Sequence, residues 1–244
     1  MSQSNLPNWA EVQPAGGERH LPVYLLIDTS DSMKGAPIEA VRQGLEQFQT
    51  ETAGDEYARS IVHVGVITFG SEAKLVTEGL VPITSFQPPI LEAAGATRLD
   101  LAFQELQASM DAHVVKPIKG AQKGDWKPCV FIFTDGLPTD SNGTLTNELW
   151  KPARDGVLNR VKGETKPSEV IAFGCGPNVV NENLKDISTG VAFRMGSSVA
   201  SFVAVLRYVS MSLAASVASG ANPDNTLLSN LDKVSLPPDL IRIP

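Results

Sequence analysis

The sequence is poor in the residues that define several classes of protein. It holds two cysteines and three histidines among 244 residues. Two cysteines are too few for a disulfide framework, and the histidines are too scattered for their spacing to suggest a Ser/His/Asp catalytic set. Cys129 and Cys175 both sit in or beside apolar runs, so we expect them to be buried free thiols.

Long apolar runs and basic clusters are also missing. No segment approaches the roughly 18 apolar residues that a membrane span needs, and the first twenty residues lack the basic and apolar regions of a signal peptide. The formal net charge is -7, with no cluster of lysine and arginine along the sequence, which argues against a nucleic-acid binder that relies on a basic groove. We therefore expect a cytoplasmic protein with neither a membrane nor a nucleic acid as partner.

The sequence does contain an ordered alternation of strand-like and helix-like segments. Its 42% hydrophobic content is enough to bury a large core. The predicted strands cover residues 22–27, 61–69, 73–81, 128–134, 169–175 and 191–195, and the predicted helices cover about 37–52, 98–112, 144–162, 181–187 and 198–216.

Most of these strands are apolar throughout rather than alternating, which is typical of strands buried on both faces. We therefore predict an α/β fold: a doubly wound, Rossmann-like, mostly parallel sheet with helices on both faces. The segment 73–81 follows a tight turn and is expected to be one antiparallel edge strand. A single domain is predicted over residues 21–218, with an N-terminal arm at 1–20 and a C-terminal arm at 219–244 laid on it.

The first predicted strand ends in side chains that carry oxygen. In VYLLIDTSDSMKG, residues 23–35, the apolar run stops at Asp28 and continues with Ser30 and Ser32. In an extended segment, a spacing of two residues sends all three side chains to the same side. The carboxyl ends of parallel strands form the binding crevice of an open sheet, so these oxygens point to a binding site.

Two further residues belong to the same predicted edge. Asp135 ends the strand in FIFTDG, and Thr97 lies in GATRLD just before a helix. Together with Asp28, Ser30 and Ser32 they form a set of oxygen ligands with no histidine or thiolate. Such a set selects a hard cation, and we expect Mg²⁺ (or Mn²⁺) that keeps some of its water.

Each of these residues also has an ordinary structural explanation. Ser30 and Ser32 could cap the helix that follows them. Asp135, which precedes a glycine, could be a turn aspartate, and Thr97 could be an N-cap. It is their joint occurrence, in this order along the chain, that favours the metal site.

The same motifs resemble a known family. DTSDS, the loop threonine and the strand-terminal TDG resemble the metal-ion-dependent adhesion site of von Willebrand factor A domains, and the strand and helix order is similar over about residues 20–218. The closer resemblance is to the bacterial TerY-like proteins of tellurium resistance. It is carried by LPVYLLIDTSDSMKGAPIEAV, VGVITFGSEAKLV, GATRLDLAF, FIFTDGLPTD and SFVAVLRYVSMSLAASV.

The resemblance implies roles for the site residues. Ser30, Ser32 and Thr97 would coordinate the metal directly or nearly so, while Asp28 and Asp135 would coordinate it directly or through water. The metal would keep an open position for an acidic residue of a partner protein. TerY-like proteins are associated with tellurite and stress operons, so a protein kinase or a PP2C-type phosphatase is implied as a candidate partner.

One residue departs from the family pattern. Asp31 stands where the family usually has glycine. We expect it to require a backbone angle that glycine adopts more easily, and its extra carboxylate could tighten metal binding or alter the choice of partner.

Two classes of function remain. The first is a non-enzymatic, metal-dependent protein-binding module. The second is an Mg²⁺-dependent phosphohydrolase, because a strand-terminal aspartate is the phosphoryl acceptor of haloacid-dehalogenase enzymes. Those enzymes need a second aspartate two positions later as acid and base, and that position holds Ser30. The sequence therefore favours the binding module.

Overall fold

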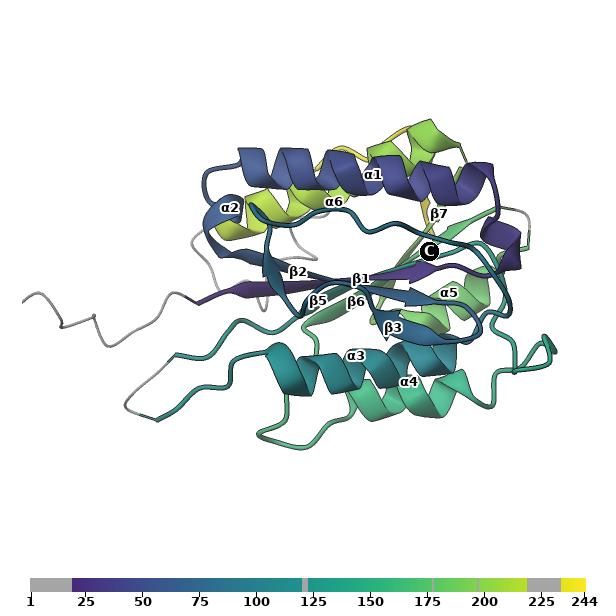
Figure 1. Cartoon of the computed structure of the whole chain (residues 1–244), viewed down its shortest axis with the longest axis horizontal. Helices are drawn as coiled ribbons and strands as arrows, with labels where there is room; N and C mark the ends of the chain where they lie inside the picture. Colours follow the sequence, from purple (N-terminus) through teal and green to yellow (C-terminus); the bar gives the residue numbers. More distant parts are fainter. Residues whose placement is uncertain (1–18, 120–122, 177, 197, 219–233) are drawn as a thin grey trace, which may run out of the picture.

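The protein forms a twisted sheet covered by helices on both faces (Figure 1). The structure is a computed structural model that describes residues 19–119, 123–176, 178–196, 198–218 and 234–244. The strands are β1 (Leu21–Asp28), β2 (Val62–Phe69), β3 (Ala73–Leu75), β4 (Val81–Pro82), β5 (Cys129–Thr134), β6 (Glu169–Cys175), β7 (Val191–Met195) and β8 (Leu240–Arg242). The helices are the 3-10 helix η2 (Asp31–Met33), α1 (Ala36–Gly54), α2 (Ala58–Ile61), α3 (Leu99–His113), α4 (Trp150–Leu158), α5 (Asn181–Ile187) and α6 (Val199–Ala218).

The sheet has the order β3-β2-β1-β5-β6-β7-β8, with β4 also paired to β2. Its five central strands, from β2 to β7, run parallel to one another. Every residue of β1 and β5 is buried, because helices cover both faces and leave no room for polar side chains. The predicted mostly parallel α/β fold is confirmed.

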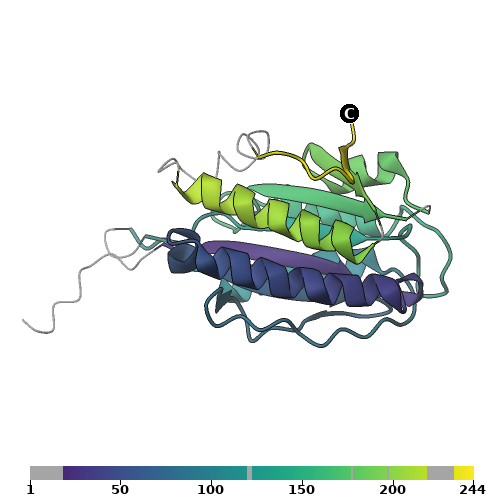
Figure 2. The ribbon, with the colours of Figure 1, turned by 90° about the horizontal axis from the view of Figure 1, so that it is seen from above.

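Strand side chains that alternate between the two faces divide the core in two. Leu25 and Phe131 face the layer formed by α1 and α6, whereas Tyr24 and Ile132 face the layer that contains α3 and α4. Figure 2 shows α1 and α6 side by side above the sheet. Cys129 and Cys175 are buried thiols that form no disulfide among the residues that the structure describes, as the sequence predicts. None of the helices in the described part of the chain is long and apolar enough to cross a membrane.

The edges of the sheet differ from the prediction. The expected strand 73–81 is two short strands, β3 and β4, both antiparallel to β2. Between them the Thr77 hydroxyl takes the place of a backbone group: it accepts from Val66 N at 3.2 Å and donates to Gly79 O at 2.9 Å. At the other edge, β8 pairs antiparallel with β7, so part of the expected C-terminal arm belongs to the sheet. Residues 1–18 and 219–233 of the two arms lie outside the described residues.

The expected helix at 144–162 is shorter, because the chain before α4 folds into a local turn. Asp140 accepts hydrogen bonds from the backbone of Asn142 and Thr144, at 2.8 and 2.9 Å, and Gly143 has a φ of 78°. An Asx turn of this kind competes with helix formation. The helix therefore begins only at Trp150.

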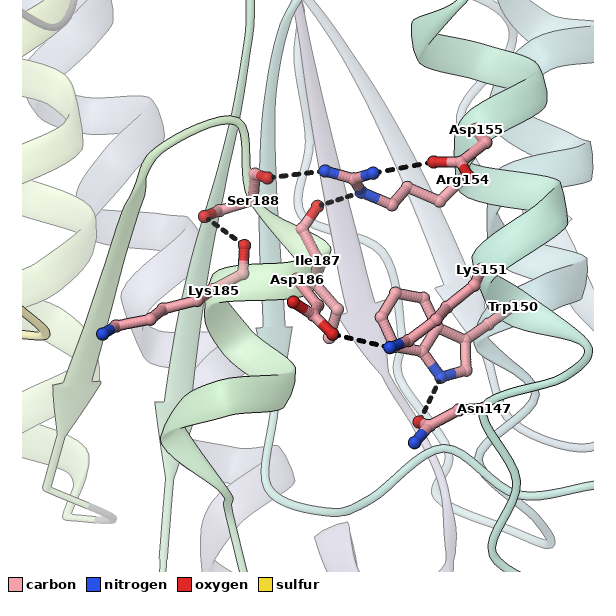
Figure 3. Close-up of polar contacts among 9 residues, drawn as sticks. All are labelled: Asn147, Trp150, Lys151, Arg154, Asp155, Lys185, Asp186, Ile187 and Ser188. Carbon is pink, nitrogen blue, oxygen red and sulfur yellow. Dashed lines mark hydrogen bonds and ion pairs between the residues drawn. The ribbon is translucent and has the colours of Figure 1, made fainter.

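Helix α4 is tied to α5 by charged contacts, drawn in Figure 3. The Arg154 guanidinium donates to the carbonyls of Ile187 and Ser188, at 3.4 and 3.0 Å, where α5 ends. Lys151 pairs with Asp186 at 2.6 Å. A cation at the last carbonyls of a helix satisfies groups that have no partner within the helix, so these contacts fix α5 beside the end of the sheet.

Helices α1 and α6 approach closely at Gly44. A Cβ atom there would lie 2.6 Å from Leu206 Cδ1 and 3.3 Å from the backbone oxygen of Phe202. Leu206 is fully buried, so it has little space to move aside. This glycine is therefore required by packing, although glycine is an unfavourable residue inside a helix.

We predict opposite effects for the same substitution at two helical glycines. Gly44→Ala should destabilise the fold by about 1–2 kcal/mol through overpacking. Gly156→Ala, in α4, meets only the end of Gln107 at 3.7 Å and should stabilise the fold by up to about 1 kcal/mol through helix propensity. Urea denaturation measures both. Stabilisation by Gly44→Ala would show that the two helices separate easily.

Candidate functional site

The candidate site lies at the carboxyl ends of β1 and β5. These strands are parallel neighbours, with Ile27 opposite Phe133. The register therefore brings the residues that follow, Asp28 and Thr134, to the same edge of the sheet. Asp135 comes next in the chain, and the loop that precedes α3 carries Thr97 to this edge.

Asp28 is fully buried and held on both oxygens. Its Oδ1 accepts from the backbone N–H of Ser30 at 2.9 Å, and its Oδ2 accepts from the Thr134 hydroxyl at 2.6 Å. Burial raises the pKa of Asp28 to about 6, and the charge of Asp135 adds to the rise, while the hydrogen bonds from Ser30 and Thr134 oppose it. A carboxylate fixed in this way is costly to keep ionised without a neighbouring cation.

The two serines connect Asp28 to Asp135. The hydroxyls of Ser30 and Ser32 lie 3.1 Å apart, and the Ser32 hydroxyl donates to Asp135 Oδ1 at 2.7 Å. Burial raises the pKa of Asp135, and the hydrogen bond from Ser32 opposes that rise. Ser30 is buried whereas Ser32 is exposed, so this group of oxygens opens to solvent on the Ser32 side.

The backbone of Thr97 is held by two hydrogen bonds to Thr139. Its N–H donates to the Thr139 hydroxyl at 2.9 Å, and its carbonyl accepts from Thr139 N at 3.0 Å. A Cβ atom built on Gly136 would lie 3.7 Å from the Thr97 hydroxyl and 3.9 Å from that of Ser32. The two hydroxyls therefore flank the same glycine, and all five predicted residues come together.

The capping explanations for the serines and the threonine are wrong. Ser30 precedes η2 but makes no side-chain capping bond, and α1 is preceded by Gly35, not by either serine. The residue that precedes α3 is Arg98, again without a side-chain capping bond. The hydroxyls of Ser30 and Ser32 point instead to each other and to Asp135.

The expectation of backbone strain at Asp31 is also wrong. No non-glycine residue in the described ranges has a positive φ. The Asp31 N–H donates to Gly95 O at 2.9 Å, and of these two residues it is Gly95 that has a positive φ, of 81°. The carboxylate is exposed and pairs with Lys34 at 2.5 Å, which holds the pKa of Asp31 below its usual range.

Three residues of the site were missed at the level of sequence. Thr134 orients Asp28, Thr139 positions Thr97, and Gly136 leaves space between the hydroxyls. Thr134 was the easiest of the three to find, since it directly precedes Asp135 at the end of the same strand. The other two are recognisable only from contacts made through the fold.

The chemistry of these donors fits a hard cation. The set contains two carboxylates and three hydroxyls, without nitrogen or sulfur, and such a set suits Mg²⁺ or Mn²⁺ with water completing the shell. Among the described residues, no group of three or more His, Cys, Asp or Glu could hold a metal, so a site of the all-carboxylate or zinc type is not found there. A cation at this position would also offset the cost of ionising Asp28 and Asp135 together.

Comparison with known proteins agrees with this architecture. Residues 23–137 match the family model of the von Willebrand factor type A domain. Similar solved structures include a von Willebrand factor type A protein from Catenulispora acidiphila (TM-score 0.56, 15% identity, 80% of this chain and 43% of that one). The ArnB paralog VWA2 from Sulfolobus acidocaldarius is similar too (TM-score 0.51, 14% identity, 80% of this chain and 45% of that one).

The pilus adhesin SpaC from Lactobacillus rhamnosus GG is a third similar structure, with a TM-score of 0.56 and 17% identity over 82% of this chain and 31% of that one. The chain thus spans less than half the length of each of these proteins, and at such identities the likeness shows the fold alone. A search of curated proteins found no match to this chain.

The raised pKa of Asp28 predicts that its charge opposes folding when no metal is present. The folded state holds the proton more tightly than the unfolded state, so stability should fall as pH rises from about 4 through about 6. In EDTA above this range, Asp28→Asn should raise the free energy of unfolding on the order of 2 kcal/mol, because the amide stays neutral. Below pH ~4 the gain should vanish.

Denaturation curves at several pH values in EDTA measure this effect. Asp31→Asn is the matched control, since that carboxylate is exposed and paired with Lys34, and it should give no gain. A wild-type protein that is at least as stable as Asp28→Asn at neutral pH would contradict the account of Asp28.

Proposed function

We propose that the chain carries a von Willebrand factor type A domain and that it is a non-enzymatic protein-binding module whose binding depends on a metal. Asp28, Ser30, Ser32, Thr97 and Asp135 would hold Mg²⁺ or Mn²⁺, and the ion would supply a Lewis-acidic position for an Asp or Glu of the partner. The observation that carries the proposal is that hydrogen bonds join four of these residues at the sheet edge, Asp28 through the backbone N–H of Ser30 and the other three through their side chains, with Ser32 exposed to solvent.

The balance of charge in the site supports a bridging role. Three of the five donors are neutral hydroxyls, so two carboxylates only just offset a divalent cation. Because the site would carry no excess negative charge to repel it, a carboxylate from a partner could still bind to the open position of the ion. Binding through such an ion would be specific in geometry and would be lost with a chelator.

The arrangement of side chains supports binding more than catalysis. Ser30, two positions after Asp28, is occupied by hydrogen bonding within the site. No histidine takes part in the described hydrogen bonds of these five residues, and the hydroxyl beside Asp28 belongs to Thr134, which donates to it. The site thus has no evident acid and base pair of the kind that phosphoryl transfer uses.

The biological setting is proposed from the resemblance to TerY-like proteins. We place the chain in a tellurium-resistance or stress-response system, with an associated protein kinase or PP2C-type phosphatase as the candidate partner. The motifs that support this placement are the strand ends of the site itself and the helix that begins near residue 199. A partner that lacks an exposed acidic residue at its interface would not fit the proposal.

We predict that the protein binds one Mg²⁺ or Mn²⁺ and that Asp135→Asn weakens this binding by at least about tenfold, because a charged ligand is replaced by a neutral one. Isothermal titration calorimetry measures the affinity of each protein for the ion. Asp31→Asn is the matched control: it removes a carboxylate from the same edge that faces Lys34 rather than the site, and it should leave the affinity nearly unchanged. Equal affinities in wild type and Asp135→Asn would rule out the assigned ligands.

Partner binding should depend on a neutral ligand as well. Thr97→Val removes one hydroxyl without changing the charge of the site, and it should shorten the lifetime of the complex by about tenfold, since a lost coordinating group acts mainly on dissociation. Thr84→Val, at an exposed loop position, is the control. Binding kinetics on an immobilised candidate kinase or phosphatase, in Mg²⁺ and in EDTA, measure both effects. Binding that is equal in the two buffers would exclude the bridge.

A further inference from the structure

Two loops meet at the end of the sheet opposite the candidate metal site. Residues 114–128 connect α3 to β5, and residues 159–168 connect α4 to β6. Both lead into the amino ends of their strands, whereas the metal site lies at the carboxyl ends (Figure 1). The six residues of β5, at ~3.3 Å each, place the two ends roughly 20 Å apart.

The loops enclose a hollow of about 730 Å³. Part of its lining is apolar and open to solvent: Val161 is 68% exposed, Val115 is 37% exposed, and Trp126 is half-buried. Large exposed apolar side chains gathered in a concave surface are typical of a binding site rather than of ordinary surface.

The rim of the hollow is basic. Seven of the chain's 20 lysine and arginine residues lie within 114–127 and 160–166, against two acidic residues, in a chain of net charge -7. Lys116, Lys127, Lys162 and Lys166 line the hollow and are exposed. Among the described residues, neither Lys162 nor Lys166 forms an ion pair. The sequence shows no basic cluster because these lysines are spaced along two separate loops.

The loop 160–166 is held in place by a buried arginine. The Arg160 side chain is 4% exposed. It donates to Thr165 O at 2.8 Å and pairs with Asp111, near the end of α3, at 2.6 Å. The basic rim on this side is therefore attached to the helix layer.

The other wall is held by hydrogen bonds and by a contact between a cation and an aromatic ring. Val115 and Asp125 exchange two hydrogen bonds at 2.9 Å. Trp126 N donates to His20 O at 2.9 Å, and the Arg19 guanidinium lies 3.3 Å from the centre of a Trp126 ring. Because these contacts already hold the described residues that line the hollow, a ligand would not have to order them.

We propose that this hollow binds an acidic, extended segment of a partner protein. Aspartates or glutamates of the segment face the four lysines, and an apolar side chain enters between Val115, Trp126 and Val161. The apolar lining favours a peptide over a nucleic acid, and the acidic remainder of the chain repels a long phosphate backbone beyond the hollow. This binding does not use the metal, so one domain joins two acidic partners at opposite ends.

The test measures the binding of a fluorescein-labelled peptide of glutamates with one central leucine to the full chain by fluorescence anisotropy. The buffer contains EDTA, so that the candidate metal site holds no ion and cannot bind the peptide. Reversing Lys162 and Lys166 together to glutamate should weaken binding by about tenfold or more. Lys74→Glu with Lys185→Glu makes the same change of charge at exposed positions outside the hollow and should change binding by less than about threefold. Thermal unfolding verifies that both double variants fold.

Four outcomes overturn the proposal. Equal weakening in both double variants means general charge attraction rather than a site. Equal binding of a peptide with serine in place of leucine means that the apolar lining is not used. Tighter binding of oligothymidylate than of the peptide assigns the hollow to nucleic acid. Self-association of the chain that is abolished by the Lys162 and Lys166 changes assigns it to a second copy.

Discussion

The pairing of β1 with β5 is the constraint on which the candidate site depends. Ile27 lies opposite Phe133, so the residues that follow them, Asp28 and Thr134, lie at the same level of the sheet. Thr134 can then donate to Asp28, and Asp135 lies within reach of Ser32. A slip of one residue in this register would turn the side chains to the opposite face. The buried apolar strands therefore hold the polar edge in place by packing on both of their faces.

The parallel centre of the fold could be predicted from sequence, because its strands are apolar throughout and its helices show a regular apolar face. The edges could not. Thr77 interrupts the edge strand by replacing a backbone hydrogen bond with its hydroxyl, and Asp140 organises a turn where a helix was expected. In both cases one side chain competes with regular structure, and hydrophobic periodicity carries no signal for that.

The residues of the candidate site also fall into a group that could be predicted from the sequence and a group that could not. The five oxygen-bearing residues were predictable because they stand at strand ends or just before a helix. The residues that orient them were not, since Gly136 and Thr139 act through contacts with Ser32 and Thr97 from distant parts of the chain. The basic hollow could not be predicted from the sequence for a similar reason. Its lysines are spaced along two loops that are separate in the chain, and they come together only where these loops meet in the fold.

The short strand β8 has a consequence for how the protein behaves in a crowded solution. Without it, β7 would present a row of unpaired backbone groups, which is the surface through which sheets of different molecules join. Through Leu240–Arg242, and through Ile243 N donating to Ala192 O at 2.9 Å, the chain fills this row itself. A segment that carries little of the core thus replaces an edge strand of five residues by one of three, and so short an edge is a poorer template for a strand of another molecule.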